Sequence, residues 1–133
     1  MIALITGKLV ELSPPQVVIL AGGVGYELDL PISHLAQLPP LGNEVTLFTH
    51  QVVREDAHLL FGFVDRAERN CFRQLIKISG IGPRIALALL STMNSQQLYV
   101  AIEEDDANTL CLTPGVGKKM AERMLLELKG KLS

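Results

Sequence analysis

The second half of the sequence repeats itself at an offset of 35 residues, and this repeat limits the possible folds more than any other feature. The offset places Gly80-Ile81-Gly82 on Gly115-Val116-Gly117. It also superimposes apolar residues on both sides of these glycines: Leu75 on Leu110, Ala86 on Ala121 and Leu90 on Leu125. Self-similarity at a fixed spacing indicates a duplicated structural unit. Each copy is predicted to be a helix, a hairpin centred on glycine and a second helix, with the apolar residue between the glycines pointing into the core.

Both predicted hairpins combine glycine with positive charge, which is typical of phosphate binding. Glycine reaches backbone angles closed to other residues and lets a phosphate approach the main chain closely. The amides and the dipole at the start of the following helix favour an anion there. Arg84, Lys118 and Lys119 occupy these first turns, where the dipole disfavours cations, and Arg123 lies one turn beyond Lys119. The predicted phosphate-binding residues are Gly80, Gly82, Arg84, Gly115, Gly117, Lys118, Lys119 and Arg123.

Two other interpretations of the hairpins stay open at this point. They are either ordinary helical corners with incidental surface charge, or parts of an interaction scaffold whose acidic half binds protein. A single Gly-x-Gly favours the first interpretation, whereas two in register, both followed by cations, favour phosphate binding. Arg69, Arg73 and Lys77 also recur every four residues on the preceding segment, which is typical of a solvated face. The alternative hypothesis is that this stripe adds long-range attraction for DNA arms.

The net charge of −2 conceals an asymmetry between the two halves of the chain. Residues 1–65 contain two basic and seven acidic residues, which gives a net charge of −5. Residues 66–133 contain ten basic and seven acidic residues, which gives +3. This separation indicates one half that binds anions and one that repels them.

The first 65 residues are predicted to be strands, separated by proline and glycine. The expected strands are Ile2–Leu9, Val17–Ala21, Tyr26–Leu30, Glu44–Thr49 and Leu59–Val64. A short helix with Ser33 as its N-cap is expected before Pro39. Five strands with a helical insert after the third predict a small Greek-key barrel of the OB type, although another small barrel remains possible. From residue 66 the apolar spacing becomes helical, so we expect an α+β protein with a barrel domain at 1–65 and an all-helical domain at 66–133.

Metal sites, disulfides and membrane anchors are not predicted. Cys71 and Cys111 lack CxxC spacing and are expected to be small buried side chains. His34, His50 and His58 lie in separate segments without ligand spacing, which is typical of surface or turn histidines. The sequence contains neither a long apolar stretch nor a signal peptide, so we expect a cytoplasmic protein without cofactors.

The paired hairpins resemble the helix-hairpin-helix family, whose members bind DNA backbones without reading base sequence. The resemblance extends to the RuvA family of bacterial Holliday-junction-binding proteins. It includes Gly22-Gly23-Val24-Gly25-Tyr26-Glu27, the segment from Phe48 through Arg54-Glu55-Asp56 to Phe63, and both hairpins. This resemblance implies an OB-type first domain, a tandem helix-hairpin-helix second domain, a homotetramer and a role in recombination and DNA repair.

The resemblance also implies partners and an acidic pin. Glu55 and Asp56 match the pin that lies near the junction centre, where negative charge would repel phosphates, and Arg54 beside it would steady crossing strands. Without the resemblance, an acidic pair in a turn is typical of a solvated loop. The implied partners are a four-way DNA junction, the hexameric ATP-driven motor RuvB and the resolvase RuvC. The chain stops at Ser133, where such proteins continue into a motor-contacting domain, so we expect impaired contact with RuvB.

An enzyme is not predicted, although helix-hairpin-helix modules also occur in glycosylases, ligases and nucleases. The sequence has no GxxxxGK[ST] loop, and Gly22-Gly23-Val24-Gly25 lacks the GxGxxG pattern. Consecutive residues Glu103-Glu104-Asp105-Asp106 scatter their carboxylates around a helix end and are typical of capping. Lys118 and Lys119 are expected to be exposed, without a desolvating pocket that would activate either one as a nucleophile. We therefore expect a DNA-binding subunit without catalytic residues.

Overall fold

The computed structural model describes residues 1–131, which divide into two compact units, Met1–Arg69 and Asn70–Ser133. The division falls inside helix α2 (Arg66–Leu75), a few residues after the expected boundary at Asp65. The first turn of this helix belongs with the first unit because Arg66 and Arg69 both lie over the Phe48 ring, at 5.5 and 5.6 Å from its centroid. Arg69 also donates from Nη1 to the carbonyl of Ala3 at 2.9 Å.

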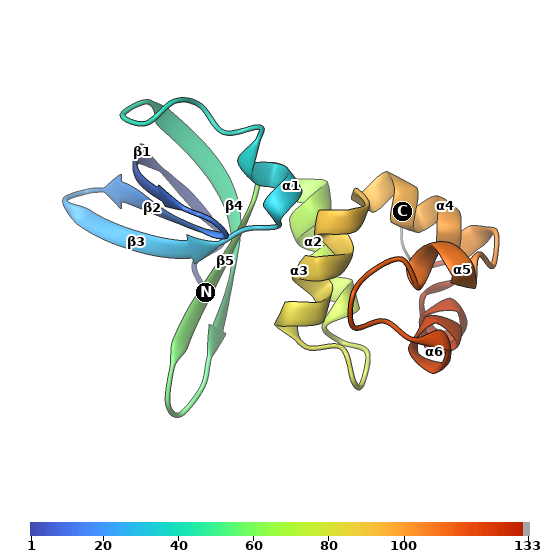
Figure 1. Cartoon of the computed structure of the whole chain (residues 1–133). Coiled ribbons are helices and arrows are strands. Elements are labelled where there is room, and N and C mark those ends of the chain that lie inside the picture. Colours follow the sequence, from blue (N-terminus) through green and yellow to red (C-terminus); the bar gives the residue numbers. More distant parts are fainter. Residues whose placement is uncertain (132–133) are drawn as a thin grey trace. The chain divides into compact units, whose positions relative to one another are not determined.

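The first unit is a closed barrel of five strands with the order β1-β2-β3-β5-β4 (Figure 1). The strands are β1 (Leu4–Ser13), β2 (Gln16–Ala21), β3 (Val24–Asp29), β4 (Glu44–Val53) and β5 (His58–Phe63). The short helix α1 (Ile32–Leu35) connects β3 to β4. All neighbours are antiparallel except β3 and β5, which pair in parallel at Asp29 and Phe61. The expected OB-type barrel with an insert after the third strand is confirmed.

Alternation along the strands fills the barrel interior. Successive residues of a strand point to opposite faces, so every second residue enters the core. The buried core side chains are Ile5, Leu9, Val17, Ile19, Leu28, Leu30 and Leu47. Gly7 is required by close packing, because a Cβ at this position would fall on the carbonyl oxygen of Leu20 in β2. The glycine thus lets β1 approach β2 closely enough for the barrel to close.

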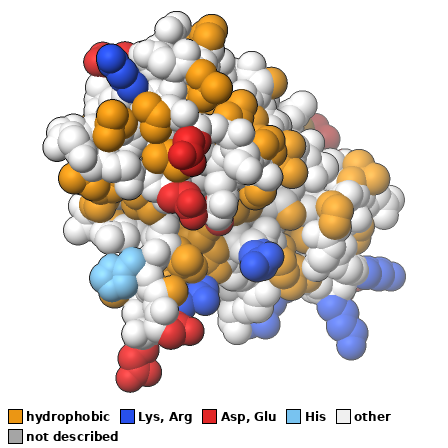
Figure 2. All heavy atoms as spheres, turned by 60° about the vertical axis from the view of Figure 1, so that its left-hand side comes forward, with side chains coloured by type: hydrophobic (Ala, Val, Ile, Leu, Met, Phe, Trp, Pro, Cys, Tyr) orange, Lys and Arg blue, Asp and Glu red, His pale blue; other side chains and the backbone are white. Residues whose placement is uncertain are grey.

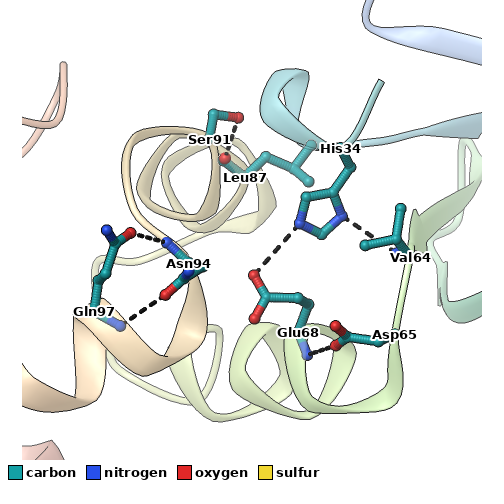
Figure 3. Close-up of polar contacts among 8 residues, drawn as sticks. All are labelled: His34, Val64, Asp65, Glu68, Leu87, Ser91, Asn94 and Gln97. Atoms are coloured by element: carbon teal, nitrogen blue, oxygen red, sulfur yellow. Dashed lines mark hydrogen bonds and ion pairs between the residues drawn. The ribbon is translucent and has the colours of Figure 1, made fainter. Parts of the chain in front are cut away.

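Helix α1 differs from its prediction in both position and burial. It begins at Ile32 rather than after Ser33, with Pro31 as an N-cap that offers no side-chain hydrogen bond. His34, expected at the surface, is buried: its Nδ1 accepts the Val64 N–H at 3.3 Å, and its Nε2 lies 3.4 Å from Glu68 Oε1 (Figure 3). These partners come from segments about 30 residues away, so local sequence could not reveal them.

The second unit consists of helices. After α2, the structure forms α3 (Pro83–Thr92), α4 (Ser95–Glu103), α5 (Ala107–Leu110) and α6 (Lys118–Leu128). Their apolar stripes meet in a core of fully buried side chains: Phe72, Leu75, Leu89, Leu90, Leu98, Ile102, Leu110 and Met124. Among residues 1–131, no single helix is long and apolar enough to cross a membrane; α3 and α4 meet that length and composition only together, across a 93° bend.

The two cysteines of this unit differ in burial, and side chains cap two of its helices. Cys71 is buried as expected, whereas Cys111 is exposed because it caps the end of the four-residue helix α5 at the surface. Asn94 caps α4 in a reciprocal capping box with Gln97 (Figure 3). Asp106 caps α5 by accepting the Thr109 N–H.

Asp106 is expected to make the stability of the second unit depend on pH. Its carboxylate accepts the hydroxyl of Thr109 at 2.5 Å and the N–H of Thr109 at 3.1 Å, and these bonds lower the pKa of Asp106 below its ordinary value. A carboxyl group whose pKa is lower in the folded than in the unfolded protein stabilises the fold at pH values above the unfolded-state pKa. This stabilisation is lost as the pH falls through the folded-state pKa. We expect Asp106→Ala to lower the thermal unfolding midpoint by a few degrees at pH 7, with the difference shrinking as the pH falls below about 4, the ordinary pKa of aspartate.

Glu104→Ala is the matched control for this cap, because Glu104 is exposed and its side chain makes no hydrogen bond within residues 1–131. Thermal unfolding of both variants at several pH values checks the prediction. A pH-independent difference between Asp106→Ala and the parent would contradict it.

Candidate nucleic-acid interface

The two hairpins have the same backbone hydrogen bonds at the same offset of 35 residues. The Ile81 N–H donates to the Ile78 carbonyl at 3.0 Å, and the Val116 N–H donates to the Thr113 carbonyl at 3.1 Å. Further equivalent bonds close the helix before and the helix after each hairpin: Ile78 to Leu75 and Thr113 to Leu110, then Ala86 to Gly82 and Ala121 to Gly117. The residues between the glycines, Ile81 and Val116, are buried as predicted. The repeat in sequence is therefore a repeat in structure.

The first glycine of each hairpin is required by the backbone. Gly80 and Gly115 have φ angles of 92° and 89°, in the left-handed region that side chains disfavour. These two glycines form the turn between the helices.

The second glycine of each hairpin has a different role. Gly82 and Gly117 have φ of −90° and −94° with ψ of −179°, an extended conformation that any residue adopts. No atom lies within 4 Å of the Cβ position at either glycine, so packing does not exclude a side chain. Both are N-caps without a capping side chain, where Ser, Thr or Asp would stabilise the helix. Neither conformation nor packing therefore requires glycine at these two positions.

Three cations stand beside these open glycines. Arg84, Lys118 and Lys119 are exposed, and none makes a hydrogen bond or ion pair with any residue in the described range 1–131. The first turns of α3 and α6 contain no acidic residue. Two helix N-termini thus carry positive charge without a protein counter-charge, which is the arrangement that an anion completes.

Arg123 lies in a different setting from the other cations. Its Nε donates to Oε2 of Glu127 at 2.8 Å, as an exposed pair one turn apart on α6. The spacing of four residues between Arg123 and Glu127 on one helix could have predicted this ion pair from the sequence. Only Nε is engaged in this pair, so the Nη groups of the guanidinium keep their donors.

The predicted acidic pin is the tip of a projecting β-hairpin. β1 pairs with β4 only as far as Phe48, whereas β4 and β5 remain paired to Val53 and His58 (Figure 1). The turn closes with a 2.7 Å hydrogen bond from the Arg54 N–H to the Ala57 carbonyl. Arg54, Glu55 and Asp56 are exposed at this tip. Figure 2 shows several acidic side chains exposed on one face of the molecule. Residues 1–65 carry a net negative charge.

Comparison with known proteins covers both units. Residues 1–62 match the family model described as RuvA N terminal domain, and residues 72–131 match SAM-like Helix-hairpin-helix tandem. The chain is 56% identical over 133 residues to the Holliday junction branch migration complex subunit RuvA of Chromobacterium violaceum, covering 100% of this chain and 68% of that protein. The chain belongs to the RuvA family.

Two further RuvA relatives bear the same printed name. The protein of Laribacter hongkongensis is 56% identical over 132 residues, covering 99% of this chain and 65% of that protein. The protein of Methylibium petroleiphilum is 58% identical over 132 residues, covering 99% of this chain and 69% of that protein. The chain thus spans about two thirds of the length of these RuvA proteins.

The basic stripe of α2 is only partly available to a ligand. Arg69 is held on the barrel by Ala3 and Phe48, so it does not contribute to a solvated face as the spacing predicted. Lys77 is exposed. Among residues 1–131, no group of three or more His, Cys, Asp or Glu side chains could hold a metal ion.

Ile85 and Met120 lie against the first glycines of the hairpins and were not predicted to be site residues. The two residues are equivalent under the 35-residue offset, so the repeat alignment contained a signal for them. Their apolar character suggested helix packing rather than a role at the site.

Proposed function

We propose that this chain binds four-way DNA junctions without reading base sequence, as the DNA-binding subunit of a branch migration complex. The observation that carries the proposal is the pair of equivalent hairpins, each with an open glycine and at least one exposed cation that has no partner among residues 1–131. Its RuvA relatives are named as Holliday junction branch migration complex subunits. A junction protein of this kind acts in recombination and DNA repair.

In the proposed complex, backbone N–H groups at the two helix starts bind phosphate oxygens, and Gly80 and Gly115 form the turns that present them. In the first hairpin the donors are Gly82 and Arg84, because Pro83 has no N–H, and in the second they are Gly117 and Lys118. Arg84, Lys118 and Lys119 neutralise the phosphates from the same helix ends. Contacts of this type fix position and orientation but carry no information on base identity. Arg123 joins them through the Nη groups that Glu127 does not engage.

The acidic tip has the opposite task. Glu55 and Asp56 lie near the junction centre in this proposal, where their charge repels phosphates and keeps separating strands apart. Arg54, beside them, binds the backbone of a crossing strand. The barrel, at residues 1–65, therefore shapes the centre, and the helical domain, at 66–133, holds the arms.

The proposed assembly is a homotetramer, because a four-way junction presents four similar arms. ATP hydrolysis belongs to the motor RuvB, and strand cleavage belongs to RuvC. The chain itself is not an enzyme in this proposal, and it works in the cytoplasm. The clustering of its negative charge in the barrel and of its cations in the hairpins supports a binding role.

A gel-shift comparison tests the proposed function. We expect the chain to bind a four-way junction at least about tenfold more tightly than a linear duplex of equal length, with affinity falling steeply as salt rises. A scrambled sequence of the same junction is expected to bind equally well. Labelled DNA incubated with Mg²⁺ is expected to stay intact. Equal affinity for junction and duplex would leave a generic DNA-binding protein, and cleavage would indicate a nuclease.

A further inference from the structure

The two hairpins contact each other through a reciprocal pair of side chains. The position that a Cβ would take on Gly80 lies 4.0 Å from Cε of Met120, and that on Gly115 lies 3.8 Å from Cγ1 of Ile85. Ile85 and Met120 are each the third residue of the helix after a hairpin, α3 or α6. Each copy of the repeat thus places one apolar side chain against the first glycine of the other copy.

Each hairpin therefore has one glycine that is covered by a side chain of the other hairpin and one glycine that is open. Met120 and Ile85 cover Gly80 and Gly115, whereas the Cβ positions of Gly82 and Gly117 have no neighbour within 4 Å. Both covering side chains are half-buried, so separation of the hairpins would expose apolar surface on each. Ile85 and Met120 thus connect the two hairpins through apolar surface.

We propose that Ile85 and Met120 are positioning residues that lock the two hairpins together, so that both engage the same DNA molecule at once. This inference rests on the proposed phosphate-binding function of the hairpins. When two sites are linked with the correct geometry, the second contact becomes intramolecular and adds strongly to affinity. Neither side chain carries charge, so any effect on DNA binding acts through the spacing of the hairpins.

The test removes the apolar contacts of Ile85 and Met120 and leaves every cation in place. We expect Ile85→Ala/Met120→Ala to bind a four-way junction about tenfold more weakly, because one hairpin disengages and the advantage of two linked sites is lost. The slope of log affinity against log salt is expected to decrease by about one to two phosphate contacts. Ile85→Val/Met120→Leu, which retains most of the apolar volume, is expected to keep the parental affinity and slope. Val100→Ala, which trims a partly exposed side chain on α4, is the matched control.

A second arm separates this proposal from the function on which it rests. Arg84→Ala and Lys119→Ala remove equivalent cations from the two hairpins. In the parent, each is expected to weaken junction binding about tenfold, as loss of a charged phosphate contact does. In the Ile85→Ala/Met120→Ala protein, at least one of these two substitutions is expected to cost less than about threefold, because one hairpin no longer engages fully.

Each outcome decides between the two proposals. Unchanged parental affinity in Arg84→Ala and Lys119→Ala would refute phosphate binding by the hairpins. If these substitutions weaken both backgrounds equally and the salt slope does not change, only the positioning role is refuted. Thermal unfolding identifies variants that lose their fold at the assay temperature, and Met120→Ala alone then carries the same comparison.

Discussion

Lys118→Glu/Lys119→Glu is expected to weaken binding of a four-way junction at least about a hundredfold, because each reversal removes a phosphate contact and adds a repulsion. Both lysines are exposed in the first turn of α6. Neither makes a hydrogen bond or ion pair within residues 1–131 that the substitution would break. Glutamate in a first turn also interacts favourably with the helix dipole, so the fold is expected to persist. Gel shifts and thermal unfolding check the two expectations separately.

The control for this variant reproduces its change in charge elsewhere. Lys8→Glu/Lys131→Glu changes the net charge equally but alters β1 and the residue three positions after α6. We expect this control to weaken binding less than about threefold, since only long-range electrostatics change. Unchanged affinity in Lys118→Glu/Lys119→Glu would favour an interaction scaffold instead.

The hairpins could be predicted from sequence because their determinants are local. A Gly-x-Gly turn with flanking apolar positions specifies the turn, the buried residue between the glycines and the start of the next helix. The sequence did not separate the roles of the two glycines. Only the backbone angles show that Gly80 and Gly115 are required by conformation, whereas Gly82 and Gly117 are not. This difference makes Gly82 and Gly117 the more informative residues for ligand approach.

Prediction from sequence failed where the partner was distant in the chain. His34 was expected at the surface, yet its hydrogen-bond partners Val64 and Glu68 lie 30 and 34 residues further along the chain. β4 was expected to end at Thr49 but continues to Val53, because β5 pairs with it beyond the edge of β1. The extra length of β4 depends on this long-range pairing and not on the propensities of its own residues.

That extension bears directly on the proposed junction centre. A turn placed at the rim of the barrel would lie among the other loops, whereas the β4–β5 hairpin carries Glu55 and Asp56 beyond the last residue that pairs with β1. Two-stranded pairing to Val53 and His58 also fixes the position of the turn. The acidic pair is thus presented on a projecting hairpin instead of a loose loop, which suits a role as a separator of strands.

Reversing the charge of this tip is expected to reduce discrimination between DNA structures. In Glu55→Arg/Asp56→Arg, four units of positive charge are added at the exposed tip, which turns repulsion of phosphates into attraction. We expect affinity for linear duplex to rise roughly thirtyfold at low salt and affinity for the junction to rise much less, because the arms already supply most junction contacts. The preference for the junction then decreases, and the gain shrinks as salt screens the exposed charges.

Two controls make this prediction specific to the tip. Glu11→Arg/Glu44→Arg adds the same charge at exposed residues on β1 and β4 and is expected to preserve the preference for the junction. Glu55→Gln/Asp56→Asn removes the charge without reversing it and is expected to give an intermediate loss of preference. Titration of both DNA structures with each variant at several salt concentrations measures the ratio. If the reversed tip and the barrel control raise duplex affinity equally, net charge explains the effect, and the pin has no separate role in excluding phosphates.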